Sequence, residues 1–462
     1  MQKIMMLVCC LLAWSLWPQL AQTVELTQLR SSISPARVRL VVDGDGPVAY
    51  RLQDSGSRLE LYLEGTTKIN RQLRLDDTYV QQAELVRKGS HSLLRINKED
   101  HCQYKIYALE NPHRLVVDIF RINLVQESRE LEPGVVHTYL QDEINGQQIQ
   151  AHVIAVSPQA NFELRPFSAA GTYNGRGLLT KAASAYGARI AVNASYFDSS
   201  GWVIGVNKDR GQLMSVDATP RSAYVDNGLQ RFFIKDVAYR GQVQLPQGGT
   251  LPIKGMNRER ITDDVVLYNE YFASSTKTNQ WGIEIKLRNH RIIDISTQGN
   301  MSIEPGTQVL SAHGYAHKNA LSQLKVGDTL ELQESLGSTW ADQAKIIVGG
   351  GPLLLENGQV NVRTREEFIA SDIAWGRAPR TALGLKRDGT LLLLVVDGRS
   401  KQSKGLTLEE LAIYFLRLGA RDALNLDGGG SSIMVIDGQA VNHPSDGRER
   451  PVSIGVGLFK KR

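Results

Sequence analysis

The stretch Asn425-Leu-Asp-Gly-Gly-Gly-Ser-Ser-Ile-Met-Val435 places one carboxylate, Asp427, between an apolar run and three glycines. Three glycines in succession are costly to order, because each loses more conformational freedom on folding than any other residue. Such a loop indicates that another group approaches its backbone closely. We expect Gly428 to Gly430 to turn successive backbone N–H groups toward that group, as an anion-binding nest does.

A predicted helix precedes this stretch in the chain. Thr407 and Glu410 have the spacing of a capping box, and apolar residues then recur every three or four positions until Gly419. Apolar strands predicted at 390–396 and 423–426 flank the helix. If these strands are parallel neighbours, Asp397 and Asp427 emerge at one edge of the sheet, where α/β proteins usually bind their ligands.

Four further stretches share the same pattern, in which a polar residue follows an apolar strand and is itself followed by glycine or other small residues. They are Val192-Asn-Ala-Ser-Tyr-Phe-Asp198, Val348-Gly-Gly-Gly-Pro-Leu-Leu354, Arg380-Thr-Ala-Leu-Gly384 and Val396-Asp-Gly-Arg399. Each pattern alone is a weak signal, since Asp-Gly is a common turn. Five such stretches in this order form a specific set.

With these five segments the sequence resembles the phosphodiester glycosidase family. The family pattern falls on Asn193–Phe197, Gly350–Pro352, Arg380–Gly384, Asp397–Arg399 and Asn425–Ser431, and Arg450-Pro-Val-Ser453 also fits. The resemblance covers residues 135 to 460. It implies an α/β (mixed α+β) catalytic domain that hydrolyses a sugar-1-phosphodiester, such as an N-acetylglucosamine-1-phosphodiester, at the sugar–phosphate linkage.

The resemblance also implies a set of site residues. The catalytic candidates are Asp427, Asp397 and Arg380, and the substrate-binding candidates are Asn193, Asp198, Gly350, Gly351, Thr381, Arg399, Asn425, Gly428, Gly429, Gly430 and Ser431. No metal ligand and no cofactor are expected. His313 and His317 have the spacing of metal ligands on a helix, but glycine and tyrosine between them disfavour the helix and no glutamate follows His313.

These residue types suit the implied chemistry. A planar guanidinium donates two parallel hydrogen bonds to a phosphate, which makes Arg380 and Arg399 the phosphate ligands. A carboxylate serves the sugar side as nucleophile or as the base that activates water, which assigns Asp427 and Asp397 there. A phosphomonoester is a good leaving group, so one working carboxylate can suffice.

Structural roles compete with each assignment. Asp427 can cap the turn after its strand, Asp397 can belong to a simple hairpin turn, and Arg380 can pair with a core carboxylate. Asn193 can order the end of its strand or contact a sugar hydroxyl. For the whole protein, a zinc amidase lacks a convincing set of histidines, and a serine hydrolase lacks the Gly-x-Ser-x-Gly elbow. A non-catalytic protein for glycan or peptidoglycan binding, or for exopolysaccharide assembly, remains the alternative function.

The sequence before the catalytic region has a different character. From residue 24 to 125 it consists of short alternating runs separated by turn residues, which predicts a small all-β sandwich. The phrase Asn111-Pro-His-Arg-Leu-Val-Val-Asp-Ile119 resembles the AMIN domain. That resemblance implies targeting to the cell envelope by binding peptidoglycan. Residues 126–134 are polar and are expected to form a linker to a catalytic domain at 135–462.

Composition and the first residues indicate the compartment. A net charge of +5 without a basic, aromatic stripe argues against nucleic acid as a partner. Residues 1–22 carry Lys3 and a short apolar run, which is typical of a signal peptide, and no later stretch is long enough to span a membrane. With Cys9 and Cys10 in that segment, Cys102 alone remains and is expected to be packed. We expect a secreted protein, periplasmic or bound to the envelope.

Overall fold

The computed structural model describes residues 24–34, 37–75, 77, 79–98, 102–120, 125–145, 147–172, 175–227 and 232–461. The chain divides into two compact units, Met1–Arg121 and Ile122–Arg462, and each is treated by itself. The signal peptide predicted at residues 1–22, with Cys9 and Cys10, lies outside the described residues. None of the described helices has the length and apolar character that crossing a membrane requires.

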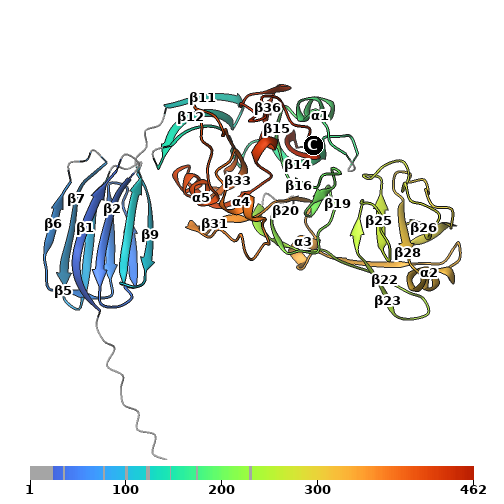
Figure 1. Ribbon diagram of the computed structural model, residues 1–462, viewed down its shortest axis with the longest axis horizontal. Helices are drawn as coiled ribbons and strands as arrows, with labels where there is room; N and C mark the ends of the chain where they lie inside the picture. The colour runs from blue at the N-terminus through green and yellow to red at the C-terminus, as the bar shows by residue number, and fades with distance from the viewer. Residues whose placement is uncertain are drawn as a thin grey trace, which may run out of the picture. The chain divides into compact units, whose positions relative to one another are not determined.

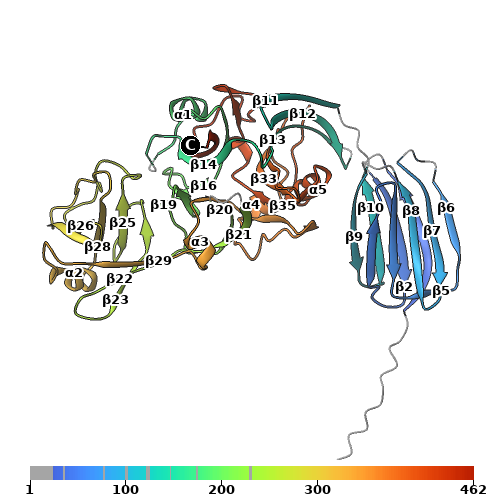
Figure 2. The ribbon, with the colours of Figure 1, turned by 180° about the vertical axis from the view of Figure 1, so that it is seen from behind.

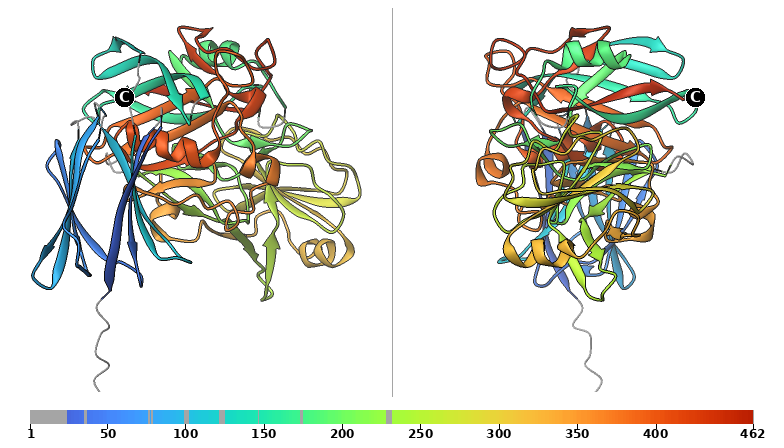
Figure 3. Two further views of the ribbon diagram at one scale, coloured as in Figure 1. Left: turned by 60° about the vertical axis from the view of Figure 1, so that its left-hand side comes forward. Right: turned by 90° about the vertical axis from the view of Figure 1, so that its right-hand side faces the viewer.

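The first unit, blue in Figure 1, is a sandwich of two five-stranded sheets, seen as two layers in the left view of Figure 3. The strand orders are β5-β1-β2-β10-β9 and β3-β4-β8-β7-β6. The strands are β1 (Glu25–Ile33), β2 (Arg37–Gly44), β3 (Tyr50–Asp54), β4 (Arg58–Leu63), β5 (Thr66–Thr67), β6 (Arg71–Arg74), β7 (Val80–Lys88), β8 (His91–Lys98), β9 (Gln103–Leu109) and β10 (Arg114–Phe120). The predicted all-β sandwich is therefore confirmed.

Alternation of apolar and polar residues builds the core between these two sheets. In β4, Leu59, Leu61 and Leu63 are fully buried, because successive side chains of a strand point to opposite faces. Cys102 packs into the same core and its Sγ lies 3.8 Å from the carbonyl oxygen of Tyr79, which confirms its predicted structural role.

The second unit is organised around an eight-stranded sheet of order β11-β12-β13-β34-β33-β35-β31-β32. The strands are β11 (Val125–Glu132), β12 (Val135–Ile144), β13 (Gln147–Val156), β31 (Leu353–Glu356), β32 (Gln359–Val360), β33 (Arg380–Lys386), β34 (Leu391–Val396) and β35 (Ala420–Asn425). Residues 126–134, predicted as a linker, instead form most of β11 and the turn into β12, with which β11 pairs antiparallel. The polar residues of this strand are tolerated because β11 is the edge of the sheet.

The centre of this sheet is buried on both faces, which explains the continuous apolar run of β34. Leu391, Leu393 and Val395 enter one core, and the alternate residues of the strand enter another. Helix α5 (Leu408–Arg417) covers the second face (Figure 2). Its predicted capping box is present: Thr407 Oγ1 accepts from the Glu410 N–H, and Glu410 Oε2 accepts from the Thr407 N–H.

The predicted β–α–β unit is wrong in one respect. Strands β34 and β35 are parallel to each other, but β33 lies between them and is antiparallel to both. The carboxyl ends of β34 and β35 still reach the same edge of the sheet. The inserted strand brings its first residue, Arg380, to that edge as well, because Arg380 pairs opposite Val396.

Smaller sheets complete the second unit. One has the order β14-β38-β15-β36-β37 and another β19-β18-β30-β20-β21. Their strands are β14 (Phe162–Ser168), β15 (Ile190–Asn193), β18 (Asn207–Asp209), β19 (Gln212–Ser215), β20 (Arg221–Asp226), β21 (Phe232–Val237), β30 (Ile346–Gly349), β36 (Met434–Ile436), β37 (Gln439–Ala440) and β38 (Ile454–Lys460), beside the short pair β16 (Tyr196–Phe197) and β17 (Val203–Ile204). The short helices are α1 (Leu179–Tyr186), α3 (Thr339–Asp342), α4 (Ser371–Trp375) and η1 (Gly429–Ser431).

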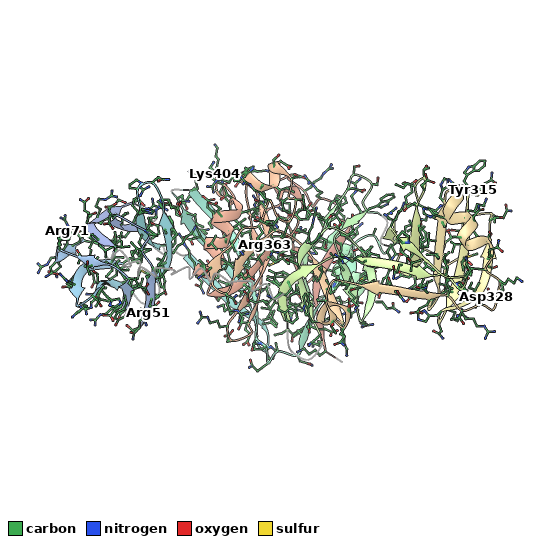
Figure 4. The ribbon with its side chains drawn as sticks, turned by 90° about the horizontal axis from the view of Figure 1, so that it is seen from below. Arg51, Arg71, Tyr315, Asp328, Arg363 and Lys404 are labelled. Carbon is green, nitrogen blue, oxygen red and sulfur yellow. The ribbon has the colours of Figure 1, made fainter. Side chains whose placement is uncertain are left out.

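Residues 240–335 form what we call the outer lobe. It contains β22 (Arg240–Gln244), β23 (Thr250–Ile253), β24 (Gly255–Met256), β25 (Val265–Asn269), β26 (Gly282–Arg288), β27 (Arg291–Ser296), β28 (Gln308–His313), α2 (Tyr315–Ser322) and β29 (Glu331–Ser335). Two of its side chains, Tyr315 and Asp328, are labelled in Figure 4. Strands predominate over helices, and the predicted mixed fold class is confirmed.

Candidate active site

One edge of the eight-stranded sheet gathers the three predicted catalytic residues. Asp397 directly follows the last residue of β34, and Asp427 lies two residues beyond the end of β35. Arg380 begins β33 between them, with Ala382 of the same strand paired opposite Asn425. Alternating strand directions therefore bring two carboxyl groups and one guanidinium to the same side of the sheet. The sequence predicted that both carboxyl groups lie at this edge of the sheet. The strand order shows that the arginine lies there too.

Asp427 is a half-buried carboxyl group at the start of the glycine loop. Its backbone N–H donates to the carbonyl of Ala194 at 2.8 Å, which fixes the loop to β15. Burial raises the pKa of Asp427 to about 6, although hydrogen bonds from Ser431 and Gly428 and the charge of Arg450 oppose the rise. A carboxyl group with this pKa changes protonation state close to neutrality, which suits a catalytic base or nucleophile.

Arg380 is a buried cation without an acidic partner. It is 2% exposed, and its Nε donates to the carbonyl of Leu406 while its Nη2 donates to the carbonyls of Ile373 and Gly376. Within the described part of the chain, no carboxylate oxygen lies within 4.0 Å of its guanidinium. The alternative that Arg380 pairs with a core carboxylate is therefore wrong.

Burial lowers the pKa of Arg380 to about 10, and the nearby charge of Arg399 contributes to the shift. The group thus keeps its charge at neutral pH. A buried charge is unfavourable unless an opposite charge compensates it. The Nη1 atom makes no hydrogen bond to any described residue, so it is the free donor of this guanidinium. A guanidinium in this state can bind an anion from outside the chain.

Arg399 supplies a second cation beside the first. Its backbone has φ 61°, in the left-handed region, and its exposed side chain reaches Ser445 Oγ at 3.5 Å from Nη1. A Cβ atom placed on Gly429 would lie 3.3 Å from Arg399 Nη2, so the guanidinium lies against the glycine loop. Arg399 follows Asp397 on the loop between β34 and α5, the loop on which Lys404 is labelled in Figure 4.

Asp397 is 3% exposed and is occupied by hydrogen bonds from within the protein. Asn442 Nδ2 donates to Asp397 Oδ1 at 3.0 Å, and the backbone N–H of His443 donates to the same oxygen at 3.0 Å. Burial raises the pKa of Asp397, and these hydrogen bonds oppose the rise. The geometry favours a positioning role over the nucleophilic role predicted from the sequence.

The residue that Asp397 positions is His443, which sequence reasoning missed. The imidazole is 81% exposed, and its Nδ1 lies 3.3 Å from Asp397 Oδ2. This contact leaves Nε2 directed away from the carboxylate. A histidine held by a buried carboxylate is a common arrangement for proton transfer. The signal in the sequence was Asn442-His443 after the glycine loop, but the link to Asp397 spans 46 residues and only the fold reveals it.

The glycine loop serves contacts within the protein more than the predicted anion nest. The Gly429 N–H donates to the carbonyl of Pro379 at 2.9 Å, and Gly428 N–H bonds the Asp427 carboxylate. A Cβ atom at Gly430 would collide with the Arg450 guanidinium. The three glycines therefore let Pro379, Arg399 and Arg450 approach the backbone. Only Gly430 keeps an N–H without an acceptor among the described residues.

Several predicted binding residues order the strand ends instead. Asn193 Nδ2 donates to the carbonyl of Asp427 at 2.6 Å, and Asn193 Oδ1 accepts from Thr381 Oγ1 at 2.7 Å. Asn193 is 1% exposed. The geometry therefore supports the alternative that Asn193 orders the end of its strand. Asp198 Oδ1 accepts from the backbone N–H groups of Ser200 and Trp202, which makes it a turn residue.

The remaining predicted residues lie behind the site. Asn425 Nδ2 donates to Tyr196 Oη at 2.7 Å and to the carbonyl of Gly351 at 3.1 Å. The Gly351 N–H donates back to the carbonyl of Asn425 at 2.8 Å, and the Gly350 N–H donates to the carbonyl of Ser222 at 3.1 Å. These groups link β35 to the glycine segment after β30 and support the loop that carries Asp427.

No group of three or more histidine, cysteine, aspartate or glutamate side chains in the described ranges is arranged to hold a metal ion. His313 ends β28 and His317 belongs to α2, so the two do not share a helix face. A cavity of about 470 Å³ lies elsewhere, beside Lys208 and Glu334. A second of about 400 Å³ is lined by Trp202 and Arg260.

Comparison with known proteins finds similarity to one enzyme family. Residues 265–459 match the model of the phosphodiester glycosidase family. The chain is 43% identical to human N-acetylglucosamine-1-phosphodiester α-N-acetylglucosaminidase over 109 residues, 22% of this chain and 21% of that protein. It is 46% identical to the bovine protein of the same name over 67 residues, 14% of this chain and 12% of that protein. The matches thus span at most about a fifth of the length of these relatives.

The matched range contains Arg380, Asp397 and Asp427, while Asn193 and Asp198 precede it. Two crystal structures share the fold over nearly the whole chain. A hypothetical protein from Synechocystis has a TM-score of 0.64 at 19% identity, covering 95% of this chain and 81% of its own. A protein from Burkholderia pseudomallei K96243 has a TM-score of 0.57 at 17% identity, covering 94% of this chain and 96% of its own.

Proposed function

We propose that this chain, which carries a phosphodiester glycosidase domain at residues 265–459, hydrolyses a sugar-1-phosphodiester at the sugar–phosphate linkage. The substrate resembles an N-acetylglucosamine-1-phosphodiester of cell-wall or exopolysaccharide glycans. One observation carries the proposal: Arg380 is a buried cation without a carboxylate, at the same sheet edge as a carboxyl group with a pKa of about 6. An anionic phosphodiester supplies the charge that Arg380 lacks.

The two arginines are assigned to the phosphate group of the substrate. A phosphodiester carries one negative charge, and cleavage of the sugar–oxygen bond leaves a phosphomonoester with an additional charge on the departing oxygen. Arg380 Nη1 and the Arg399 guanidinium are the donors available to stabilise this charge as it develops. Because the backbone carbonyls around Arg380 hold its guanidinium in place, little reorganisation is needed at the moment of bond cleavage.

Asp427 is assigned to the reaction at the anomeric carbon of the sugar. As the bond between the anomeric carbon and the phosphate oxygen breaks, positive charge develops on the sugar ring. The Asp427 carboxylate either attacks that carbon or takes a proton from the water that does. In both cases the hydroxyl group of water ends on the sugar and the phosphomonoester leaves. His443 Nε2 is the exposed group suited to carry the remaining proton to solvent.

For the cellular setting, we place the protein outside the cytoplasm, secreted and periplasmic or bound to the envelope. The signal-like residues 1–22 and the AMIN-like character of the first unit support this placement. The first unit then holds the enzyme on peptidoglycan while the second acts on its substrate. A glycan-binding or exopolysaccharide-assembly protein without turnover is the competing function.

Turnover of a defined substrate separates these two functions. The full chain is incubated with the methyl diester of N-acetylglucosamine-1-phosphate, and ³¹P NMR follows the diester and methyl phosphate signals. We expect the diester signal to be replaced by methyl phosphate, with free N-acetylglucosamine in equal amount. Persistence of the diester together with saturable binding would show a non-catalytic glycan-binding protein instead.

A further inference from the structure

A cavity of about 470 Å³ lies at the base of the outer lobe, away from the residues of the candidate active site. It is lined by residues of β18, β25, β29, α3 and the turn between β26 and β27. Its volume falls in the range of small-molecule sites, about 300–1,000 Å³. None of the residues assigned to phosphodiester hydrolysis reaches it, so the proposed function does not account for this cavity.

Lys208, which lines the cavity, differs from the other buried lysines among the described residues. Lys98 lies 3.7 Å from Asp54, and Lys286 lies 3.1 Å from Glu304, so each has a carboxylate within ion-pair distance. Lys208 is 6% exposed and donates to the backbone carbonyl of Asp342 at 2.6 Å, with no described carboxylate oxygen within 4.0 Å. Burial accordingly lowers its pKa. An ammonium group has three N–H donors, so hydrogen-bonding capacity remains here.

Glu334 faces the same cavity from β29. Its Oε1 accepts from Tyr239 Oη at 2.9 Å, and Glu334 is an exposed residue that lines the cavity. Desolvation by the neighbouring protein atoms raises the pKa of Glu334, whereas the hydrogen bond from Tyr239 and the charges of Lys208 and His290 oppose the rise. The carboxyl group and the ammonium group thus attract each other across the cavity without closing an ion pair.

The gap between these two groups defines the chemistry of a ligand that fills it. The ligand needs an acceptor for Lys208 and a donor for Glu334 on neighbouring atoms. Adjacent hydroxyl groups of a sugar ring provide both, because each hydroxyl donates and accepts. Leu213, Met256 and Leu287 add apolar lining suited to the C–H face of a ring. We propose that this cavity is a second glycan site, which binds a neutral pyranose unit through hydroxyls bridging Lys208 and Glu334.

The charges around the cavity disfavour ionic ligands. Besides Glu334, the acidic residues Glu270 and Asp342 line it, so an anion meets three acidic residues. A cation meets the buried ammonium of Lys208. A neutral, hydroxyl-rich ligand avoids both repulsions. Such a site would hold a distant unit of a polymeric glycan without taking part in bond cleavage.

Isothermal titration of the full chain with N,N′-diacetylchitobiose, a neutral sugar, tests the site without requiring turnover. Glu334→Gln keeps the shape and an acceptor for Tyr239 but replaces the carboxylate. Loss of a hydrogen bond to a charged group weakens binding about tenfold or more. We expect that loss in Glu334→Gln, together with weaker binding of glucosamine and glucuronate than of the neutral sugar by the unmodified protein.

Glu331→Gln is the matched control, because Glu331 lies on the same strand, is exposed and belongs to the opposite face. It should bind the sugar like the unmodified chain. Equal affinity in Glu334→Gln, with an unchanged melting temperature, would show that the sugar binds elsewhere, at the active site included, and would overturn the proposal. The absence of chitobiose binding by the unmodified protein would overturn it as well, whatever the outcome of the turnover assay.

Discussion

At the scale of single residues, the two arginines of the site differ in what holds them. Arg380 is buried and donates to three backbone carbonyls, while Arg399 is exposed and touches Ser445. A lysine keeps the charge at either position but loses the planar fork. The two substitutions should therefore affect stability differently, even though both groups are proposed to bind the same phosphate.

We expect Arg399→Lys to lower kcat/KM by the equivalent of about 1.5–3 kcal/mol, the worth of a charge-assisted hydrogen bond, without changing the melting temperature. Arg380→Lys should lower both activity and melting temperature, since three carbonyls lose donors. Steady-state kinetics and thermal melting of the two variants measure this difference. Unmodified kinetics in Arg399→Lys would remove Arg399 from the phosphate site.

The dyad of Asp397 and His443 gives a second prediction at this scale. If His443 carries a proton for the reaction, His443→Ala should lower kcat about 10²–10⁴-fold without changing the melting temperature. His91→Ala is the control, because His91 is an exposed histidine of the first unit whose side chain hydrogen-bonds Ser90. An unchanged kcat in His443→Ala would leave the histidine with no role in proton transfer.

At the scale of elements, helix α4 ends at Trp375, directly before a residue that holds the Arg380 guanidinium. Trp375 is 69% exposed and precedes Gly376, whose carbonyl accepts a hydrogen bond from Arg380. Because aromatic faces pack against the C–H faces of sugars, Trp375→Ala should raise KM severalfold with little change in kcat. Trp281→Ala is the matched control, as Trp281 is 65% exposed on the outer lobe. Equal KM values in both variants would exclude a substrate contact for Trp375.

Elements also show how far the sequence could predict this site. The capping box of α5 and the apolar run of β34 are local signals, and the helix and the strand that they predict are both confirmed. The insertion of β33 between β34 and β35 is a long-range pairing that periodicity does not encode. For the same reason Arg380 was predicted from its motif rather than its position. His443 was missed because its partner Asp397 is distant in the sequence.

The glycines show a second limit of what the sequence alone can predict. A run of glycines predicts close approach to the backbone, but not which group approaches. Gly430 lies against Arg450, and Gly429 lies against Arg399. Both neighbours are side chains of the protein rather than substrate, and no local pattern distinguishes the two cases.

At the scale of the whole molecule, the division into units sets where the chain can be cut. Strand β11 pairs with β12 along the edge of the eight-stranded sheet, so the second unit begins before residue 125. We expect residues 122–462 to retain turnover of a small soluble phosphodiester and to lose binding to insoluble peptidoglycan. A chain starting at residue 133 should be less stable, because it lacks β11. Co-sedimentation and turnover assays measure the two properties.

A folded 122–462 chain that sediments with peptidoglycan as the full chain does would contradict this division of labour. So would loss of turnover in that chain when its melting transition is intact. Either result would show that the first unit contributes to catalysis or that the second carries the envelope contact.

The central claim is that Asp427, ionised with a pKa of about 6, does the chemistry on a sugar-1-phosphodiester. Its most direct test is the pH–rate profile of Asp427→Asn, of the unmodified chain and of Asp388→Asn. Asp388 is an exposed turn residue at the opposite edge of the same sheet. The unmodified chain and Asp388→Asn should lose activity as pH falls through about 6, because protonation removes the reacting carboxylate. Asp427→Asn should be folded and slower by several orders of magnitude at every pH. An Asp427→Asn protein that keeps more than about a tenth of the rate, a barrier change under about 1.4 kcal/mol, would contradict the account.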